Sequence, residues 1–385
     1  MEPTFSMLIP TKNRAHLLQF AIRSVLQQTW HDFELVISDN NSSDGTGSMV
    51  TGFADRRIKY VNTGCDVPGV ANWNNAYRQA TGQYLICIGD DDFLLPDCLE
   101  SYAKAIREWN GPSLLSSYNA VYYPNDFFVK RQRNTLVIQT GDATTCLLDT
   151  APLLESIYTT LDVPFPTQPV CYAKHLLEQI SEEEGPYQPI HPDYYCLASA
   201  LLHCSRCVEI RKQLVLLGRG STSIGVSDIF TDSRKQSYAV LKDPEVMRGI
   251  MLPLAGNFFV NGHYATLQRV KLRYLNHCPY ELKNLREYYA GCDYQLRLWR
   301  KRRLELGVEE AASEEKLRKL PLRVRAYLVY RRLQRYAKAV APFSLLNLYN
   351  SFAGTRSITY KLNPSVQNIE DCANWLLGHS IRDAE

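Results

Sequence analysis

The chain has 385 residues, of which 45% are hydrophobic and 22% are charged, and its formal net charge is +3. This composition is typical of a globular protein and excludes a disordered or fibrous chain, and the small charge gives no reason to expect a nucleic-acid partner. No apolar run approaches the roughly 18 residues of a membrane-spanning helix. The amino-terminal sequence MEPTFSMLIP lacks the basic segment of a secretory signal, so we expect a cytoplasmic protein.

The first hundred residues alternate between apolar segments and amphipathic ones. Short apolar segments predict buried strands, and apolar residues at helical spacing predict helices. The predicted strands are residues 4–10, 33–38, 57–62 and 84–89, and the predicted helices are residues 17–26, 70–82 and 95–109. This alternation predicts an α/β fold with a mostly parallel sheet and helices on both of its faces.

The pattern changes after the first hundred residues. Residues 113–190 are rich in Tyr and Pro, and we expect loops and edge strands that face the substrate. A helix at 195–204 and a strand at 207–218 follow, and the remainder is helix-rich by periodicity. We therefore divide the chain into an α/β domain of residues 1–225 and a helical accessory region of residues 226–385.

The cysteine content indicates reduced thiols. The eleven cysteines are odd in number and lie in apolar contexts such as LICIG, which favours buried free thiols over disulfides. Cys204 and Cys207 form the one close pair, and a second such pair that would complete a zinc site is missing. We expect packed thiols there and no metal.

The segment YLICIGDDDFLLPD ends an apolar strand in three consecutive carboxylates, Asp90, Asp91 and Asp92. Like charges about 4 Å apart repel by roughly 1 kcal/mol in water and by more where water is excluded. If the chain turns here, two carboxylates can converge on Mg²⁺ or Mn²⁺, an ion that commonly shares such sites with substrate phosphates. The alternative is a solvated acidic turn in which Asp92 or Asp97 caps the next helix.

Two further polar loops, PTKNR and SDNNSSDGT, also follow predicted strands. Ligands of open α/β sheets bind at the edge formed by the carboxyl ends of the strands, so these loops and the aspartates belong together. The glycine patterns of dinucleotide and P-loop sites are missing. Asp39, at the end of the second strand, can accept a hydrogen bond from a base or a ribose, or can serve only as a turn residue.

At these residues the sequence resembles a known family. SMLIPTKNR, SVLQQTWHDFELVISDNNSSDGT and GVANWNNAYRQATGQYLICIGDDDFLLPD follow, in order, the pattern of family 2 glycosyltransferases with the Rossmann-like GT-A fold. The resemblance is strong over about the first 100 residues and continues more weakly to about residue 225. It implies an inverting, Mn²⁺- or Mg²⁺-dependent transfer of sugar from a nucleotide-diphosphate sugar, with UDP expected, to a carbohydrate or lipid-linked hydroxyl. It also suggests bacterial surface polysaccharide assembly.

The resemblance further implies roles for individual residues. Those expected to contact the nucleotide sugar are Pro10, Thr11, Asn13, Arg14, Asp39, Asp90 and Asp91. Asp91 or Asp92 is the expected metal ligand, and Asp90 is expected to contact the ribose or to lie behind the ligands. The family commonly carries an Arg-Asn pair ahead of this region, whereas this chain has NWNNA, so Asn72 or Asn75 is expected to bind the nucleotide by hydrogen bonding.

An inverting transfer needs a base that deprotonates the attacking hydroxyl. The family has an acidic residue near the start of a helix about 100 residues after the aspartates, and PIHPDYYCLASALL offers Asp193 there. Asp193 can instead be a simple helix cap. His191 is the rival base, although a lone His before Pro is more often structural.

The tract between Arg297 and Lys338 combines clustered Arg and Lys with apolar side chains. It fits a helix lying on the inner face of the cell membrane and equally fits a solvated bundle with ion pairs to glutamates. Those glutamates are Glu309, Glu310, Glu314 and Glu315. We expect no nucleic-acid binding, because no binding module is present.

Two rival functions remain open. A nucleotidyltransferase that makes sugar nucleotides would use a similar sheet, but a Gly-rich, Arg-containing loop is expected after its first strand, and PTKNR differs from it. A catalytically silent protein that binds nucleotide sugars and acts as a scaffold at the membrane is the second rival. The retained aspartates argue against it.

Overall fold

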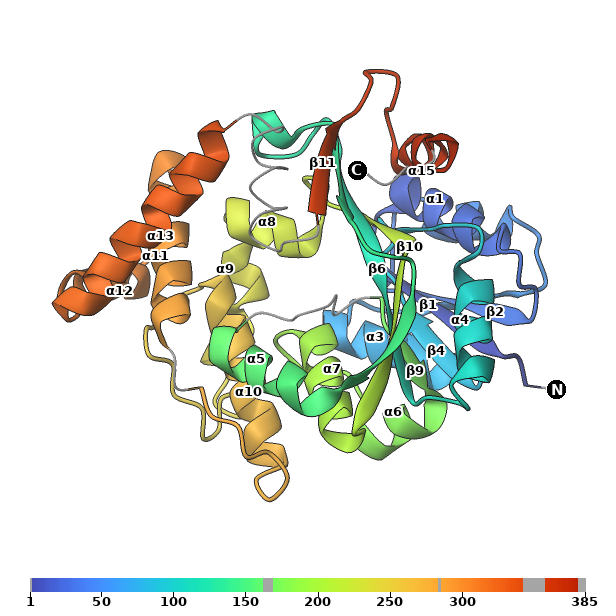
Figure 1. The fold of residues 1–385 in the computed structure, drawn as a ribbon, viewed down its shortest axis with the longest axis horizontal. Helices are drawn as coiled ribbons and strands as arrows, with labels where there is room; N and C mark the ends of the chain where they lie inside the picture. The colour runs from blue at the N-terminus through green and yellow to red at the C-terminus, as the bar shows by residue number, and fades with distance from the viewer. Residues whose placement is uncertain (1, 162–168, 283–284, 342–356, 380–385) are drawn as a thin grey trace.

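The computed structural model describes residues 2–161, 169–282, 285–341 and 357–379, and Figure 1 shows their arrangement. Within these residues, eleven strands form one sheet, with helices packed on its two faces and further helices beyond one side. The predicted mixed α/β fold with a helical carboxyl-terminal region is confirmed. Residues 162–168, which belong to the predicted region of loops and edge strands at 113–190, lie outside the described residues.

The half of the sheet nearest the amino terminus is parallel. Its strands, in spatial order, are β3 (Ile58–Asn62), β2 (Phe33–Asp39), β1 (Phe5–Thr11) and β4 (Tyr84–Cys87). The register pairs Thr11 with Asp39 and Asp39 with Asn62, so these strands end at one edge. The polar loops that follow the strands therefore start side by side, as the sequence predicts.

The other half of the sheet is mixed. Its longer strands, β6 (Leu114–Tyr123) and β10 (Arg206–Gly218), are parallel to each other. Antiparallel partners complete it: β5 (Phe93–Leu94), β7 (Thr135–Gln139), β8 (Thr145–Asp149) and β9 (Cys171–Ala173). Because β6 lies inside the sheet, the expectation of loops and edge strands over 113–190 is wrong for that strand. Its sequence LLSSYNAVYY buries polar residues such as Ser116 and Asn119, which hides the apolar pattern of a buried strand.

Alternate residues of the central strands point to different helical layers. Met7 and Ile9 of β1 pack beneath α1 (Ala15–Leu26) and α4 (Cys98–Glu108), whereas Leu8 faces the other layer. That layer contains α3 (Gly69–Gln79), α5 (Thr150–Thr160), α6 (Lys174–Ile180) and α7 (Pro192–His203). Short elements at the rim are α2 (Thr46–Thr51) and the 3-10 turn η1 (Lys130–Gln132). The sheet is thus covered on both faces, as its apolar strands require.

Helices dominate the chain after β10. They are α8 (Ile224–Phe230), α9 (Arg234–Ser237), η2 (Ala239–Lys242), α10 (Phe259–Arg273), α11 (Leu285–Lys301), α12 (Val308–Arg318) and α13 (Leu322–Val340). In Figure 1, α11, α12 and α13 lie together at the left, away from β1 and β2. Across the described ranges, none of the helices is both long enough and apolar enough to cross a bilayer.

The last described segment returns to the sheet. Strand β11 (Ser357–Lys361) pairs antiparallel with β7, and α15 (Ile369–Gly378) covers the sheet beside α1 (Figure 1). Arg23 of α1 forms an ion pair with Glu370 of α15 at 3.1 Å. The division at residue 225 stays a prediction, and this segment shows that some contacts of the sheet come from far beyond it.

Candidate active site

A tight turn after β4 brings the three aspartates to the edge where β1 and β2 end. The Thr11 hydroxyl donates a hydrogen bond to Asp90 at 2.7 Å. The Arg14 guanidinium forms ion pairs with both Asp90 and Asp91, and its distance to Asp91 is 3.0 Å. One cation thus lies between two of the three carboxylates, which offsets part of their repulsion.

The third carboxylate is held by backbone amides. Asp92 accepts hydrogen bonds from the N–H of Gly89 at 2.8 Å and from the N–H of Gly218 at 3.1 Å. The Ser223 hydroxyl donates to Asp91 at 2.6 Å. Gly218 and Ser223 belong to the end of β10 and the loop after it, so a segment more than a hundred residues away completes the cluster.

The cluster is buried, and burial disfavours charge. Burial, opposed by Arg14 and reinforced by Asp91, raises the pKa of Asp90 to about 6. Burial and then the charge of Asp91 raise the pKa of Asp92 to about 8. The metal-free cluster therefore carries less than three negative charges at neutral pH, and proton uptake is part of how the chain tolerates three adjacent aspartates.

Gly218 is required by a close backbone approach. A Cβ atom at this position would lie 2.0 Å from the backbone oxygen of Asp91. We expect Gly218→Ala to push the aspartate turn out of place and to lower thermal stability by several degrees, whereas Gly220→Ala, whose Cβ would meet only atoms 3.6 Å away or farther, should change it little. Thermal melts of both variants test this, and equal melting temperatures would contradict the close approach.

The first two loops are joined by hydrogen bonds. Asn13, which follows Pro10 and Thr11 and has a φ of 52°, accepts a hydrogen bond from the N–H of Ser43 at 2.7 Å. Asp39 is buried and accepts bonds from Ser42, from the Tyr60 hydroxyl at 2.6 Å and from Asn62 at 3.2 Å. The structure thus places these predicted nucleotide-contacting residues on adjacent loops, and the contacts themselves stay predictions.

Asn72 and Asn75 lie behind the loops. The Asn72 amide donates to the carbonyls of Thr11 and Ser38, and its oxygen accepts from the Ser38 hydroxyl at 2.7 Å. Asn75 donates to the same hydroxyl at 2.8 Å. This arrangement favours a positional role, because the buried Asn72 side chain fixes the ends of β1 and β2.

Asp193 lies in the first turn of α7, which starts at Pro192 and so begins earlier than predicted. Burial raises the pKa of the Cys87 thiol, and the charges of Asp193 and Asp92 raise it further. Both carboxylates therefore lie within electrostatic range of this thiol at the end of β4.

His191, the rival base, is packed among aromatic rings. Its Nε2 lies 3.1 Å from the Tyr238 hydroxyl, and its ring centre lies 4.6 Å from that of His263. Burial lowers the pKa of His191 to about 4. A neutral, tightly packed imidazole of this kind fits a structural role.

Sequence reasoning missed three residues of the site: Gly218, Arg219 and Ser223. The exposed Arg219 follows β10, and its positive charge partly opposes the burial and the Asp91 charge that raise the pKa of Asp92. It is a candidate for the cationic contact that the missing Arg-Asn pair would supply. The sequence does indicate these residues, because the polar segment RGSTS directly follows a predicted strand and so lies at a sheet edge.

The carboxylates suit a metal ion only with help from a substrate. Within the described ranges, no three His, Cys, Asp or Glu side chains gather so that they could hold a metal ion. Asp91 uses one oxygen, Oδ2, for Arg14 and Ser223, and its Oδ1 atom makes no hydrogen bond to a described residue. Hard oxygen ligands of this kind fit Mg²⁺ or Mn²⁺ that is also bound by phosphates and water.

All eleven cysteines are free thiols, and Cys204 donates to the Ala200 carbonyl.

Comparison with known proteins finds a family match in the amino-terminal part of the chain. Residues 6–149 match the model described as glycosyl transferase family 2. This segment contains the parallel strands and the aspartate cluster. The predicted resemblance is confirmed.

Two curated relatives match the same part of the chain. The GalNAc(5)-diNAcBac-PP-undecaprenol beta-1,3-glucosyltransferase of Campylobacter jejuni is 38% identical over 109 residues, which is 28% of this chain and 35% of the relative. The UDP-Glc:alpha-D-GlcNAc-diphosphoundecaprenol beta-1,3-glucosyltransferase WfgD of Escherichia coli is 28% identical over 116 residues, which is 30% of this chain and 46% of the relative. The matched segment thus spans about a third to a half of these relatives.

A solved structure resembles more of the chain at lower identity. The structure of S. aureus TarS 1–349 in complex with UDP-GlcNAc covers 86% of this chain and 88% of its own, with 17% identity and a TM-score of 0.47.

Proposed function

We propose that this chain is an inverting glycosyltransferase that moves a sugar from a UDP-sugar to a hydroxyl of a carbohydrate or lipid-linked acceptor. The observation that carries the proposal is the ion-paired cluster of Arg14, Asp90 and Asp91 at the edge where β1 and β2 end. It lies inside the segment that matches glycosyl transferase family 2. A buried site with convergent carboxylates at this edge is suited to a diphosphate and its cation.

The names of the relatives support the donor and acceptor classes. WfgD is named for UDP-Glc and for a GlcNAc-diphosphoundecaprenol acceptor, and the Campylobacter protein is named for a diphospho-undecaprenol glycan. Since the matched segment contains the expected donor-binding loops, a UDP-sugar is the proposed donor. A lipid-linked glycan is the proposed acceptor, and bacterial surface polysaccharide assembly is the proposed setting.

Asp91, with Asp92 or Asp90, would hold Mn²⁺ or Mg²⁺. When bound, such an ion neutralises negative charge on the departing diphosphate. Arg14 keeps the two neighbouring carboxylates together, and the backbone amides of Gly89 and Gly218 fix the third. Preorganised groups of this kind stabilise charge without reorganising during the reaction.

Asp193 is the proposed general base. It would accept the proton of the acceptor hydroxyl as that oxygen attacks the anomeric carbon from the face opposite the diphosphate. The bond from the anomeric carbon to the diphosphate oxygen breaks as the new glycosidic bond forms, so no covalent enzyme intermediate is needed. Asp193 lies in the first turn of α7.

Thermal-shift titration tests donor binding directly. We expect UDP with Mn²⁺ to raise the melting temperature of the full chain, because a ligand at about 100 times its Kd adds about 2.7 kcal/mol to the stability of the native state. Asp91→Asn should reduce this shift to the level of UDP without metal. Asp97→Asn is the matched control, since Asp97 follows the cluster by a few residues and pairs with Lys212.

The outcome also separates the rival functions. The proposed role of Asp91 would be contradicted if Asp91→Asn and Asp97→Asn both lost the shift, or if both kept the full wild-type shift. A wild-type shift without any UDP-sugar hydrolysis or transfer would favour the catalytically silent binding protein. Formation of a UDP-sugar from UTP and a sugar phosphate would favour the nucleotidyltransferase.

A further inference from the structure

A cavity of about 450 Å³ lies among α11, α12 and α13, in the part of the chain that the family match does not cover. Five arginines line it: Arg297 and Arg300 from α11, Arg318 from α12, and Arg325 and Arg332 from α13. Asp293 and Glu314 are the acidic residues of the lining, so five guanidinium groups face two carboxylates. The net positive charge suits an anionic ligand.

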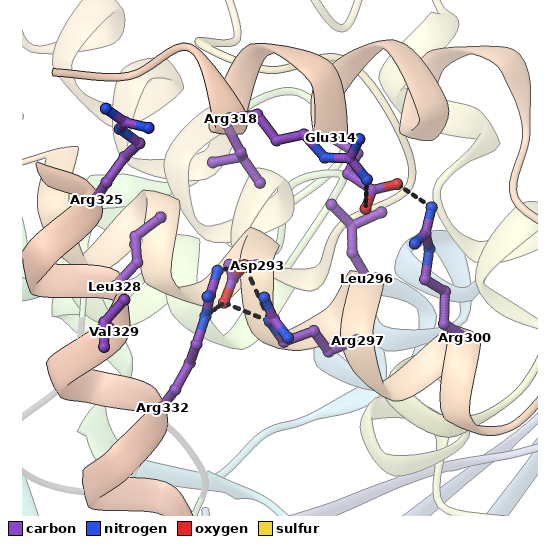
Figure 2. Close-up of a pocket in the computed structure, with 11 residues that line it drawn as sticks. Asp293, Leu296, Arg297, Arg300, Glu314, Arg318, Arg325, Leu328, Val329 and Arg332 are labelled. Carbon is purple, nitrogen blue, oxygen red and sulfur yellow. Dashed lines mark hydrogen bonds and ion pairs between the residues drawn. The ribbon is translucent and has the colours of Figure 1, made fainter. Parts of the chain in front are cut away.

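The arginines differ in how they are paired. Asp293 binds Arg332 at 2.6 Å and Arg297 at 3.2 Å, and Glu314 binds Arg300 and Arg318. These pairs include part of the ion-paired bundle expected from the sequence. Arg325 makes no side-chain hydrogen bond or ion pair within the described part of the chain, and Figure 2 shows it beside the cavity without a partner. One guanidinium is therefore available to an anion without breaking an ion pair.

The cavity is also partly apolar. Leu296, Leu317, Leu328 and Val329 contribute to its lining. Leu328 and Val329 lie between Arg325 and Arg332 along α13, so apolar and cationic groups alternate at the cavity wall (Figure 2). A ligand that carries both a phosphate and a hydrocarbon portion fits such a lining better than a small inorganic anion does.

An exposed apolar stripe runs along α13 next to the cavity. Leu322, Val329, Leu333 and Tyr336 are between 47% and 74% exposed and recur at helical spacing on one side of the helix. Val329 belongs both to this stripe and to the cavity lining. The stripe therefore borders the cavity directly.

The charge of α13 has one sign. Its sequence LRVRAYLVYRRLQRYAKAV contains five arginines and one lysine and has no acidic residue. A helix with an apolar stripe and exposed basic residues such as Arg323 and Arg325 is typical of helices that lie in the interface of an anionic bilayer. Clustered basic residues near such a surface add favourable electrostatic energy for each charge.

We propose that α13 and the arginine cavity form a binding surface for anionic phospholipid bilayers. The phosphate of a lipid head group occupies the cavity beside Arg325, and the apolar stripe of α13 enters the boundary between head groups and acyl chains. The proposal is independent of the transferase assignment, because vesicle binding is measured without turnover. It would place the full chain on the surface where a lipid-linked acceptor resides.

The test is flotation of the full chain with vesicles of two compositions. We expect binding to phosphatidylcholine vesicles that contain phosphatidylglycerol and at least about tenfold weaker binding to phosphatidylcholine alone. Arg325→Glu and Leu333→Asp should each weaken binding to the anionic vesicles by about tenfold, because one reverses the free charge and the other places a charge in the apolar stripe. Both side chains are exposed, so melting temperatures should stay close to wild type.

Arg323→Glu is the matched control. It makes the same charge change on the same helix at an exposed position that is absent from the cavity lining, and it should weaken binding by less than about threefold. Equal loss in the Arg323 and Arg325 variants would overturn the cavity as the head-group site. Equal binding to both vesicle types, or saturable binding of inorganic phosphate that depends on Arg325 without any vesicle binding, would overturn the membrane proposal.

Discussion

Asp193→Asn is expected to remove sugar transfer while leaving donor binding intact. Loss of a general base costs about 10²- to 10⁴-fold in rate, and asparagine keeps the shape of the side chain but cannot accept the proton. The donor is expected to bind to the loops after β1, β2 and β4, so the thermal shift with UDP and Mn²⁺ should equal that of the wild type. Initial rates with a saturating acceptor, measured beside the thermal shift, separate the two effects.

Asp149→Asn is the matched control for this variant. Asp149 also lies at the amino-terminal end of a helix, but it pairs with Arg206 at the start of β10, at the opposite end of that strand from Gly218. Its replacement should leave transfer within about twofold of wild type. If Asp193→Asn retained sugar transfer and His191→Gln lost it, the general base would be His191 and not Asp193.

The parallel half of the sheet was predictable because its strands are almost wholly apolar. FSMLIPT and FELVISD bury nearly every residue, and each is followed by a polar loop, which fixes both the strand and the position of its carboxyl end. Strand β6 escaped prediction because it buries Ser116, Ser117 and Asn119. Burial of polar residues depends on neighbours that are distant in sequence, and a local pattern does not contain them.

The candidate site shows the same limit. The three aspartates and Arg14 lie in loops whose role follows from the strands before them. Gly218 and Ser223 reach the cluster only because β10 pairs with β5 and β6, and the order of strands is a property of the folded chain. For Asn72, the sequence indicated a polar residue near the loops but could not distinguish a ligand contact from hydrogen bonds to the backbone of Thr11 and Ser38.

Arg14 connects the stability of the fold to the function of the cluster. Its side chain is 15% exposed and that of Asp90 is 3% exposed, so their ion pair is largely shielded from water. Removing one partner of a buried pair leaves an uncompensated charge, which costs more than the pair itself contributes. Arg14 therefore offsets the repulsion among the three carboxylates, and its loss should make that repulsion measurable as lower stability.

Arg14→Gln is expected to lower the free energy of unfolding by about 3–5 kcal/mol near pH 8 and by clearly less near pH 5. The folded-state pKa values of Asp90, about 6, and Asp92, about 8, are raised above the unfolded value of 3.8. The native state thus binds more protons than the unfolded state between these limits, so the contribution of both groups to stability falls as pH rises from about 4 to 8. Without Arg14, which lowers the pKa of Asp90, this fall becomes steeper.

Urea denaturation at the two pH values measures the free energy of unfolding of Arg14→Gln and of the wild type. The pH dependence of other groups cancels in the difference between the two proteins. Arg23→Gln is the control on α1, since the side chain of Arg23 is 41% exposed in its pair with Glu370, and such pairs contribute about 0–1 kcal/mol. Mn²⁺ with UDP should recover part of the stability lost in Arg14→Gln, because a bound cation supplies positive charge to the same carboxylates. A deficit that is equal at both pH values would show that Arg14 stabilises the fold by packing alone, and that the aspartates do not repel one another in the native state.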